Sequence, residues 1–559
     1  MKKIITFALG ATLAFSATAQ TWQDALLFSE NNYSGTARGV GMGNALTAIG
    51  GDTGSLVFNP AGSATTSFSQ FTITPGVTFS FTGTQASADN IDAYRGQSVG
   101  NTYARMKLPN AGFIINMNTG RRSGLKRMSF GFVVNSTNNF TGRFKTAGVN
   151  EDNSYAASLA SSADGFAQDV LANEDWYYSG DRRRMPAWVD MTGYRSGMFN
   201  SVTGRDGAYV ALTEIIDEDG NFRLAAPVYQ QYGQQSYGSK TDAIFNFAMN
   251  FSDRFYVGAN IGITALRYNM SEFWSEMPDN PSDFPAIRYS DGTTARFESL
   301  RMNRKYRLAG NGVYFKVGAL WRPVDGLRVA AAIQTPTLLN LTERYVYSGE
   351  VNLSTRSRST SSSPEDEWIY ALRAPFRFNL GVAYTLGSVA VVSADYEFAH
   401  YGQARFRSRT SDYEYAVGDF ADVNLDIKDL LGPAHQLRLG AEFKATPDLS
   451  VRAGYNLTTG AQRNYLDGNN VVPLSAQDRL AQMKHSLSAG VGYSFGSFFV
   501  DAALRARFVP REYVIPYNYY YAPDPTQFYN KVVDDAIITP EIMVKNTLLD
   551  VLLTLGWRF

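Results

Sequence analysis

The sequence predicts an all-β fold: a 14-stranded antiparallel transmembrane β-barrel with a small N-terminal hatch, or plug, in its lumen. Three observations predict it. The chain begins with an export leader but has no later apolar stretch long enough for a spanning helix. Many segments alternate apolar and polar residues with a period of two. The connections between these segments are alternately short and long, which is typical of outer-membrane barrels.

Residues 1–19 have the features of a secretory signal peptide. Lys2 and Lys3 precede the apolar run 4–15, and small residues around Ala19 form a cleavage site. The sequence contains no cysteine, so we expect no lipidated cysteine, disulfide framework or thiolate metal site. The 51 basic and 51 acidic residues balance, so no global field attracts nucleic acid. We expect an exported protein of a Gram-negative cell envelope.

The period-two pattern is clearest in the last segment. Phe559, Trp557 and Leu555 fall on one face, whereas Arg558 and Gly556 fall on the other. The pattern predicts fourteen strands near residues 69–81, 101–118, 127–141, 241–251, 254–270, 299–321, 326–346, 368–386, 388–405, 434–446, 448–460, 482–495, 497–511 and 546–559.

The connections distinguish a barrel from a soluble sandwich, which would also alternate. Long segments at 142–240, 271–298, 406–433 and 512–545 are separated by tight turns such as "FSDR" and "FGS". Short periplasmic turns and long extracellular loops explain this asymmetry. We therefore expect residues 69–559 to form the barrel in the outer membrane, with 142–240 as the longest extracellular loop and both termini in the periplasm.

The ending "LLTLGWRF" predicts an assembly signal at Trp557 and Phe559. Outer-membrane barrels commonly end in a phenylalanine after alternating apolar residues, and the barrel assembly machinery reads this ending. The alternative is an ordinary C-terminal strand. We expect the assembly machinery and outer-membrane lipids as partners of the chain.

Residues 20–68 precede the first strand, so we expect them to form the hatch inside or under the barrel. Gly39, Gly41 and Gly43 do not match a dinucleotide-binding loop because no strand precedes them and the spacing differs. Glycine tolerates unusual dihedral angles, so we expect this part of the hatch to bend and move. Asp52 should pair with an inward arginine, for which the candidates are Arg377, Arg438 and Arg452.

The stretch "ARGVGMGNALTAIGGDTGSLVFNPAG", which ends at Asn59, Pro60, Ala61 and Gly62, resembles the N-terminal hatch of FadL-type outer-membrane transporters of long-chain fatty acids and of related TodX-type aromatic-hydrocarbon channels. "WRPVDGLRVAAAIQTPT" and "HQLRLGAEFKATPDLSVRAGYNLTTG" resemble strands of the same proteins. The resemblance implies passive transport of hydrophobic small molecules, such as long-chain fatty acids, with no cofactor. The solute would enter a lumenal pocket and leave sideways when the hatch shifts.

In that family the lateral opening lies beside a kinked third strand. The matching stretch here is "SFGFVVNSTNNFTGRF", in which five consecutive polar residues interrupt the lipid-facing alternation. We predict the kink or gap there; the alternative is that the strand leaves the membrane at this point. The five residues are Asn135, Ser136, Thr137, Asn138 and Asn139.

Two groups of loop aromatics are candidates for capturing an apolar ligand, because their rings offer large apolar area with a polar tip. The alternative is an interfacial girdle or loop packing. Residues 182–184 are three arginines that match a substrate carboxylate or lipopolysaccharide phosphates, or form a solvated loop. The aromatic candidates are Trp176, Tyr177, Tyr178 and Trp188, and Tyr517, Tyr519, Tyr520 and Tyr521.

Enzymatic function is not expected. His400, His435 and His485 lie in or beside separate strands, without metal-ligand spacing or a nucleophile signature. The competing hypothesis is a protein-binding shuttle of a secretion machine, which uses the same scaffold in Bacteroidetes, a phylum that the leader ending in Ala-Gln suits. A sealed polar lumen and a hatch without a pocket would favour the shuttle.

Overall fold

The computed structural model describes residues 20–86, 94–175, 186–204, 207–218, 220, 222–289, 291–409, 420–467, 470–517 and 540–559. The predicted signal peptide lies outside these residues. Among them, no helix is both long and apolar enough to cross a membrane.

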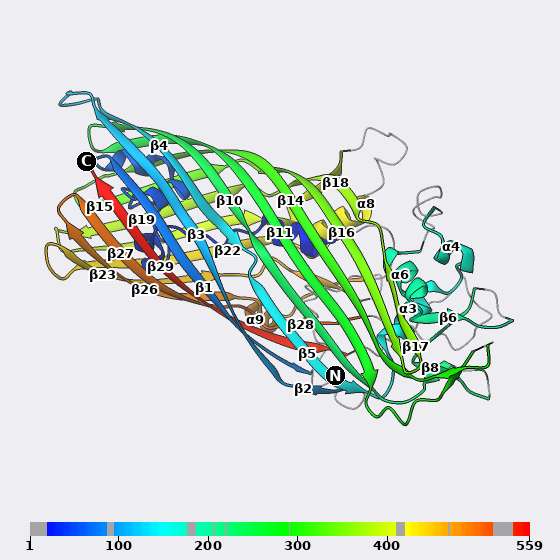
Figure 1. Cartoon of the computed structure of the whole chain (residues 1–559). Coiled ribbons are helices and arrows are strands. Elements are labelled where there is room, and N and C mark those ends of the chain that lie inside the picture. Colours follow the sequence, from blue (N-terminus) through cyan, green and yellow to red (C-terminus); the bar gives the residue numbers. More distant parts are fainter. Residues whose placement is uncertain are drawn as a thin grey trace.

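The wall is a closed antiparallel barrel of fourteen strands, as predicted (Figure 1). β1 (Gln70–Ala86) closes it by pairing with β3 (Val99–Asn118) on one side and with β29 (Ile542–Arg558) on the other. Five wall strands consist of two pieces each: β4 (Leu125–Asn139) with β5 (Gly142–Asn150), β16 (Leu338–Leu353) with β15 (Leu327–Gln334), β18 (Asp366–Arg373) with β19 (Arg377–Leu386), β20 (Ala390–His400) with β21 (Arg405–Ser408), and β27 (Phe498–Phe508) with β28 (Glu512–Val514). The other wall strands are β10 (Val228–Phe251), β11 (Phe255–Pro278), β14 (Phe297–Trp321), β22 (Pro433–Lys444), β23 (Leu449–Thr458) and β26 (Lys484–Phe495).

The two faces of the wall differ as the alternation predicts. On β29, Leu553, Leu555 and Trp557 are exposed outward, while Asp550 and Thr554 are buried toward the lumen. Such an apolar outer face needs lipid rather than water around it, which identifies an outer-membrane barrel.

The two ends of the barrel differ in their connections (Figure 1). At one end, the short-turn end, tight turns such as 252–254 and 387–389 join the strands. Phe559 also lies at this end, where its main chain pairs with Ser69. At the other, the long-loop end, the connections carry short helices and hairpins: β2 (Tyr94–Gln97), β12 (Ile287–Arg288), β13 (Thr294–Ala295), β17 (Arg356–Ser362), α8 (Ala421–Leu430), β24 (Asn464–Asp467), β25 (Asn470–Pro473) and α9 (Ala476–Ala481).

The longest loop is shorter than predicted. The expected loop 142–240 begins with β5 and ends with the first half of β10, so the true insertion covers 151–227. The upper part of β10, "VYQQYGQQSYGSK", is polar on both faces. Hydrophobic alternation therefore does not mark it as a strand, although it continues the main-chain ladder beyond the apolar band.

The insertion folds into a compact lid at the long-loop end. It contains α3 (Tyr155–Ala163), α4 (Gln168–Ala172), α6 (Trp188–Ser196), β6 (Phe199–Ser201), β7 (Tyr209–Ala211), β8 (Glu214–Ile216) and β9 (Phe222–Leu224). Its core is continuous with the wall, because the Tyr155 ring stacks on Trp274 of β11 with centroids 5.3 Å apart.

Residues 20–69 lie in the lumen and form four short helices, α1 (Trp22–Ser29), α2 (Ala37–Gly41), η1 (Thr53–Val57) and η2 (Pro60–Thr65). Each begins at a residue whose side chain accepts a hydrogen bond from the first turn, and Pro60 occupies the first position of η2. The four capping residues are Thr21, Thr36, Asp52 and Asn59. We call residues 20–69 the hatch.

Candidate functional site

The Asn-Pro-Ala segment of the hatch rests in a seat made by two wall glycines. Gly258 of β11 and Gly318 of β14 face each other in register. A Cβ atom on Gly258 would lie 2.6 Å from the carbonyl carbon of Pro60, and one on Gly318 would lie 2.9 Å from Pro60 Cδ. The Asn59 amide donates to the main-chain oxygens of Thr47, at 3.0 Å, and of Ala319, at 3.1 Å. Only glycine permits this approach of hatch and wall.

A second glycine pair receives Met42 and Gly43, in the middle of the hatch. Gly440 of β22 and Gly454 of β23 are also in register, and Cβ atoms there would overlap the main chain of Met42 and Gly43. Gly43 itself has φ +62°, where side chains are strained. In this structure Gly43 allows close docking of the hatch against the wall, and bending of the hatch at Gly39, Gly41 and Gly43 stays a prediction.

Asp52 does not pair with any of the three predicted arginines. Its carboxylate caps η1 by accepting from the Gly54 amide at 2.7 Å, and it also accepts from Thr36 Oγ1 at 2.8 Å. Burial raises the pKa of Asp52 above its ordinary value. The prediction was wrong because the inward arginines are engaged by carboxylates of the wall, which the hatch sequence alone does not reveal.

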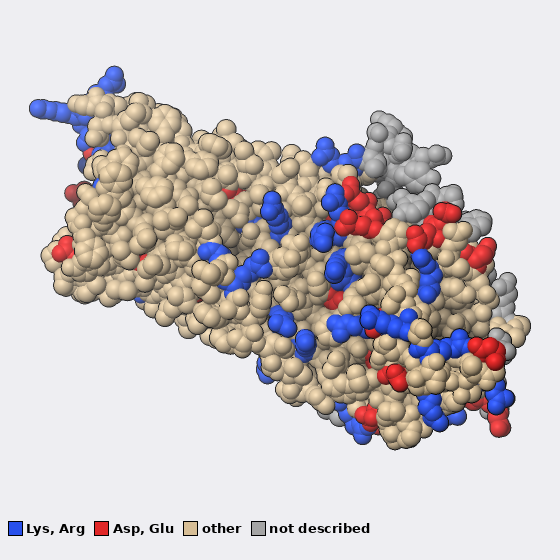
Figure 2. All heavy atoms as spheres, viewed as in Figure 1, with Lys and Arg blue, Asp and Glu red and all other residues tan. Residues whose placement is uncertain are grey.

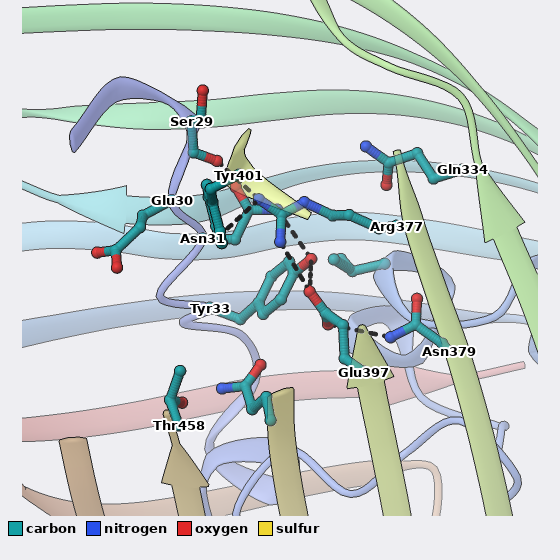
Figure 3. A network of polar contacts seen from close by, with 12 residues as sticks. Ser29, Glu30, Asn31, Tyr33, Gln334, Arg377, Asn379, Glu397, Tyr401 and Thr458 are labelled. Carbon is teal, nitrogen blue, oxygen red and sulfur yellow. Dashed lines mark hydrogen bonds and ion pairs between the residues drawn. The ribbon is translucent and has the colours of Figure 1, made fainter. Parts of the chain in front are cut away.

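Arg377 and Arg438 instead converge on Glu397 of β20, and Figure 3 shows Arg377 beside Glu397, Tyr33 and Ser29. Arg377 donates to Glu397 at 2.9 Å and to the Ser29 main-chain oxygen of α1 at 2.6 Å. Tyr33 Oη of the hatch donates to the same carboxylate at 3.3 Å. This buried hub ties the hatch to three neighbouring wall strands.

Two further ion groups anchor the hatch on other sides. Arg38 of α2 pairs with Glu442 at 2.8 Å, which also binds Arg452. Arg505 of β27 pairs with Asp550 at 2.8 Å and donates to the Tyr33 main-chain oxygen at 2.7 Å. The sequence analysis did not identify these carboxylates as partners of the hatch, although the period-two alternation of each strand places them on its lumenal face.

An apolar cluster fills the lumen between the ion groups and the lid. Phe28 of α1 packs edge-on against Tyr268 of β11, with centroids 5.7 Å apart, and against Phe140 at 6.2 Å. We call this set the lumenal cluster; its buried members include Leu266, Tyr306, Leu308, Leu339, Leu341, Tyr370, Leu372, Phe406 and Ile427. The lumen is thus largely apolar at mid-height and is occupied by a hatch helix, and it encloses a buried carboxylate, Glu343, which accepts from Tyr306 Oη at 3.0 Å and from Tyr370 Oη at 2.8 Å.

The third wall strand is broken beside this cluster. β4 ends at Asn139 and β5 begins at Gly142, and a register shift with β10 precedes the break between Ser136 and Asn138. The pairing of β3 with β4 extends from Asn118 only to Asn110, which faces Asn135. Figure 1 shows the change of direction between β4 and β5.

Beyond Asn135 the hatch replaces β3 as the partner of β4. The Asn32 amide donates to the Thr137 oxygen at 2.6 Å, and the Ser34 amide donates to the Ser136 oxygen at 3.0 Å. Among the predicted opening residues, Asn135, Ser136, Thr137 and Asn138 are buried and Asn139 is half-buried. β3 passes over the break, where the Arg105 guanidinium lies 4.6 Å from the centre of the Tyr237 ring.

Only two of the predicted capture aromatics fall within the described residues. Trp188 is buried in the lid core, and Tyr517 is buried and donates to Asn153 while accepting from Gln230 at 2.6 Å. In this structure both rings pack the lid against the barrel mouth. Trp176, Tyr177, Tyr178, Tyr519, Tyr520, Tyr521 and the arginines of 182–184 lie outside the described residues, so capture stays a prediction.

The lid contains a buried carboxyl group that predicts pH dependence. Asp190 of α6 accepts from Ser162 Oγ at 3.0 Å, and burial raises its pKa to about 7 from 3.8. The folded lid therefore binds this proton more tightly than the unfolded lid does, and its stability falls as pH rises between about 4 and 7.

We expect amide hydrogens of α3 and α6 to exchange more slowly at pH 5.5 than at pH 7.5, after correction for intrinsic exchange rates. The Asp190→Asn variant should remove this difference, because its side chain does not titrate. An unchanged pH difference in the variant would assign the effect to another group.

The predicted assembly-signal residues and two of the three histidines lie on the outer face of the barrel. Trp557 and Phe559 are exposed on the outer face with ring centroids 4.8 Å apart, and their role as an assembly signal stays a prediction. His435 and His485 bond to tyrosines of adjacent strands on the outer face. Within the described part of the chain, no three His, Asp or Glu residues are grouped as a metal site.

The fold and site together define a plugged antiparallel barrel of the outer membrane. No family model and no curated protein sequence matches this chain. Similar solved structures include a Pseudomonas aeruginosa FadL homologue (TM-score 0.47, 12% identity, 95% of this chain and 99% of that chain). They also include the Ralstonia pickettii toluene transporter TbuX (0.45, 13%, 95% and 100%) and the P. putida toluene transporter TodX (0.45, 12%, 95% and 99%). FadL and TodX are the two groups that the sequence resemblance named.

Proposed function

We propose that this protein passes hydrophobic small molecules, long-chain fatty acids or similar apolar compounds, through the outer membrane by diffusion. The long-loop end faces the cell exterior and the C-terminal Phe559 faces the periplasm, whereas Gln20, the first residue of the mature chain, is buried in the lumen, where its side-chain amide donates to Glu343 at 3.0 Å, contrary to the expected periplasmic position. Loop aromatics capture the solute, which then reaches the lumenal cluster below the lid. No energy source is required, since the solute moves between apolar environments.

One observation carries the proposal: the lumenal cluster is continuous with the break in the wall. Phe140 lies in the break between β4 and β5, yet it packs on Phe28 and Tyr268 inside the lumen. An apolar solute in the position of Phe28 would therefore contact the residue that lines the gap. We place lateral exit between β3 and β5, because there β3 pairs with β1 but has no main-chain partner among the described residues on its other side, and the hatch pairs with β4 in its place.

The tethering experiment tests whether the hatch must move. Thr53 Oγ1 of η1 lies 2.6 Å from Thr72 Oγ1 of β1, so Thr53→Cys with Thr72→Cys should form a disulfide between hatch and wall. The chain has no native cysteine to interfere. We expect uptake of a fluorescent long-chain fatty acid into reconstituted vesicles to fall at least about tenfold when oxidised and to recover on reduction.

The matched control places the same cross-link within the wall. Thr82 of β1 faces Asn546 of β29 in register, with Thr82 Oγ1 3.5 Å from Asn546 Oδ1, so the Thr82→Cys, Asn546→Cys pair constrains no part of the hatch. Oxidation of the control should leave uptake unchanged. Uptake that persists through a fully formed hatch disulfide would contradict hatch movement. Absence of probe uptake in the unmodified protein, with a secreted protein co-purifying, would instead favour the shuttle.

A further inference from the structure

The outer surface of the wall carries a band of basic side chains on one side of the barrel. Arg267 of β11, Lys305 and Arg307 of β14, and Arg344 of β16 are all exposed, and we call them the basic arc. Figure 2 shows Lys and Arg gathered about halfway along this face, whereas the wall towards the short-turn end is nearly free of charge.

The height of the basic arc follows from the strand register. Ile263, Val313 and Leu338 lie opposite one another on β11, β14 and β16, and are 48%, 50% and 54% exposed. The apolar band extends from this row to Trp321, eight residues away, or about 20 Å along the membrane normal for tilted strands. Arg307 and Arg344 lie six residues beyond the row, about 15 Å higher. The arc therefore starts where lipid headgroups replace acyl chains.

The charge of the arc is incompletely balanced by the protein. Arg307 and Arg344 face each other directly across β14 and β16, an arrangement of like charges that destabilises a strand pair. Glu365 lies 3.8 Å from Arg307, and Glu367 lies 2.5 Å from Arg344. Arg267 and Lys305 form no ion pair with any described residue. An anion from outside the chain would complete this surface.

One side of the wall lacks outward basic residues. The outward positions of β22, β23 and β26 carry no Lys or Arg, and the polar residues among them are His435, Tyr455, His485 and Tyr493. A general need for charge at the membrane surface would distribute basic residues around the whole barrel. Outward basic residues beside the arc, Lys145 of β5, Arg373 of β18, Arg407 of β21 and Lys545 of β29, continue it around the barrel but leave the side of β22, β23 and β26 without positive charge, so the basic surface covers one side only.

We propose that the basic arc binds the phosphate groups of the outer-leaflet glycolipid, lipid A. Its acyl chains lie against the apolar band below, and its phosphates meet the arc, where guanidinium groups bind phosphate oxygens in pairs. Each basic residue near an anionic membrane surface contributes to the attraction. The inference rests on the orientation given with the proposed function, and it concerns the outer surface rather than the lumen.

The test measures retention of lipids by the detergent-purified barrel. The Arg267→Gln, Lys305→Gln double variant removes two charges that form no ion pair within the part of the chain that the structure describes, so no carboxylate of that part is left unpaired. Native mass spectrometry with diphosphorylated lipid A should show at least about tenfold weaker binding than in the unmodified barrel. The control, Arg121→Gln with Arg122→Gln, removes two exposed charges at the short-turn end and should leave binding unchanged.

Three results would overturn the proposal. The first is that the double variant binds lipid A as tightly as the unmodified barrel does. The second is that the unmodified barrel binds lipid A stripped of its phosphates as tightly as intact lipid A. The third is that it binds phosphatidylglycerol, which carries phosphate without the glycolipid scaffold, as tightly as lipid A. Because the readout is lipid retention, it is independent of fatty-acid uptake, so failure of the proposed transport would be seen separately.

Discussion

Valine at Gly258 and Gly318 is expected to release the hatch from the wall while the barrel still folds. Both positions lie in strands, where a β-branched residue is favourable, and neither has a positive φ. Their side chains, however, would occupy the space now filled by Asn59 and Pro60. Overpacking costs about 1–3 kcal/mol at each site, so the two together should raise the population of undocked hatch by roughly a hundredfold.

Limited proteolysis measures this directly, because an undocked hatch exposes cleavable main chain within 20–69. Mass spectrometry should find cleavage there in the double variant and conductance in planar bilayers should rise. Gly83→Val with Gly100→Val is the matched control, since this pair is also in register but a Cβ at either position meets no atom within 4 Å. Equal cleavage in both variants would mean that the glycine seat does not hold the hatch.

The wall strands could be predicted from the sequence because the surroundings of each strand determine its own alternation of apolar and polar residues. On β29, lipid on one side and a packed lumen on the other force the alternation of Leu553 and Leu555 with Thr554. The strand ends at the long-loop side were not predictable, because β5 and the upper part of β10 continue as main-chain ladders without an apolar face. Hydrogen bonding alone leaves no pattern in the side chains.

The hatch shows the opposite limit. Its glycines, Asn59 and Pro60 stand out in the sequence, but their partners Gly258 and Gly318 lie on strands about two hundred or more residues later. Only register brings the two glycines together, and register across a barrel depends on every turn between them. The prediction for Asp52 failed for the same reason. The three candidate arginines pair with Glu397 and Glu442, carboxylates on other strands that only the register brings close.

The lumen combines a largely apolar centre with buried ion groups, and under the proposed function this combination would let one hatch be both firmly seated and movable. Apolar contacts between Phe28 and the wall can be exchanged for a solute at little cost, since the solute buries the same surface. The ion hub at Glu397 offers no such exchange, because a hydrophobic solute cannot replace a carboxylate. We therefore expect α1 to move when a solute binds, while the contacts of the Glu397 hub stay in place.

Loss of the Glu397 carboxylate should consequently be far more damaging than loss of an exposed one. Glu397→Ala leaves the guanidinium groups of Arg377 and Arg438 buried without their shared partner. Breaking a buried pair costs about 3–5 kcal/mol, so the urea midpoint of unfolding in detergent should fall markedly and proteolysis within the hatch should increase. Glu367→Ala, which removes an exposed carboxylate paired with Arg344, is the control and should unfold like the unmodified barrel.

The conservative variant Glu397→Gln separates charge from shape. Its amide oxygen can still accept one of the arginine hydrogen bonds, so we expect an intermediate loss of stability if both the charge and the hydrogen bonds matter. Unfolding of Glu397→Ala at the urea concentration of the Glu367→Ala control would show that the hub adds nothing to stability. In that case the hatch would have to be held by the ion groups at Glu442 and Asp550, the glycine seats, and the main-chain pairing of Asn32 and Ser34 with β4.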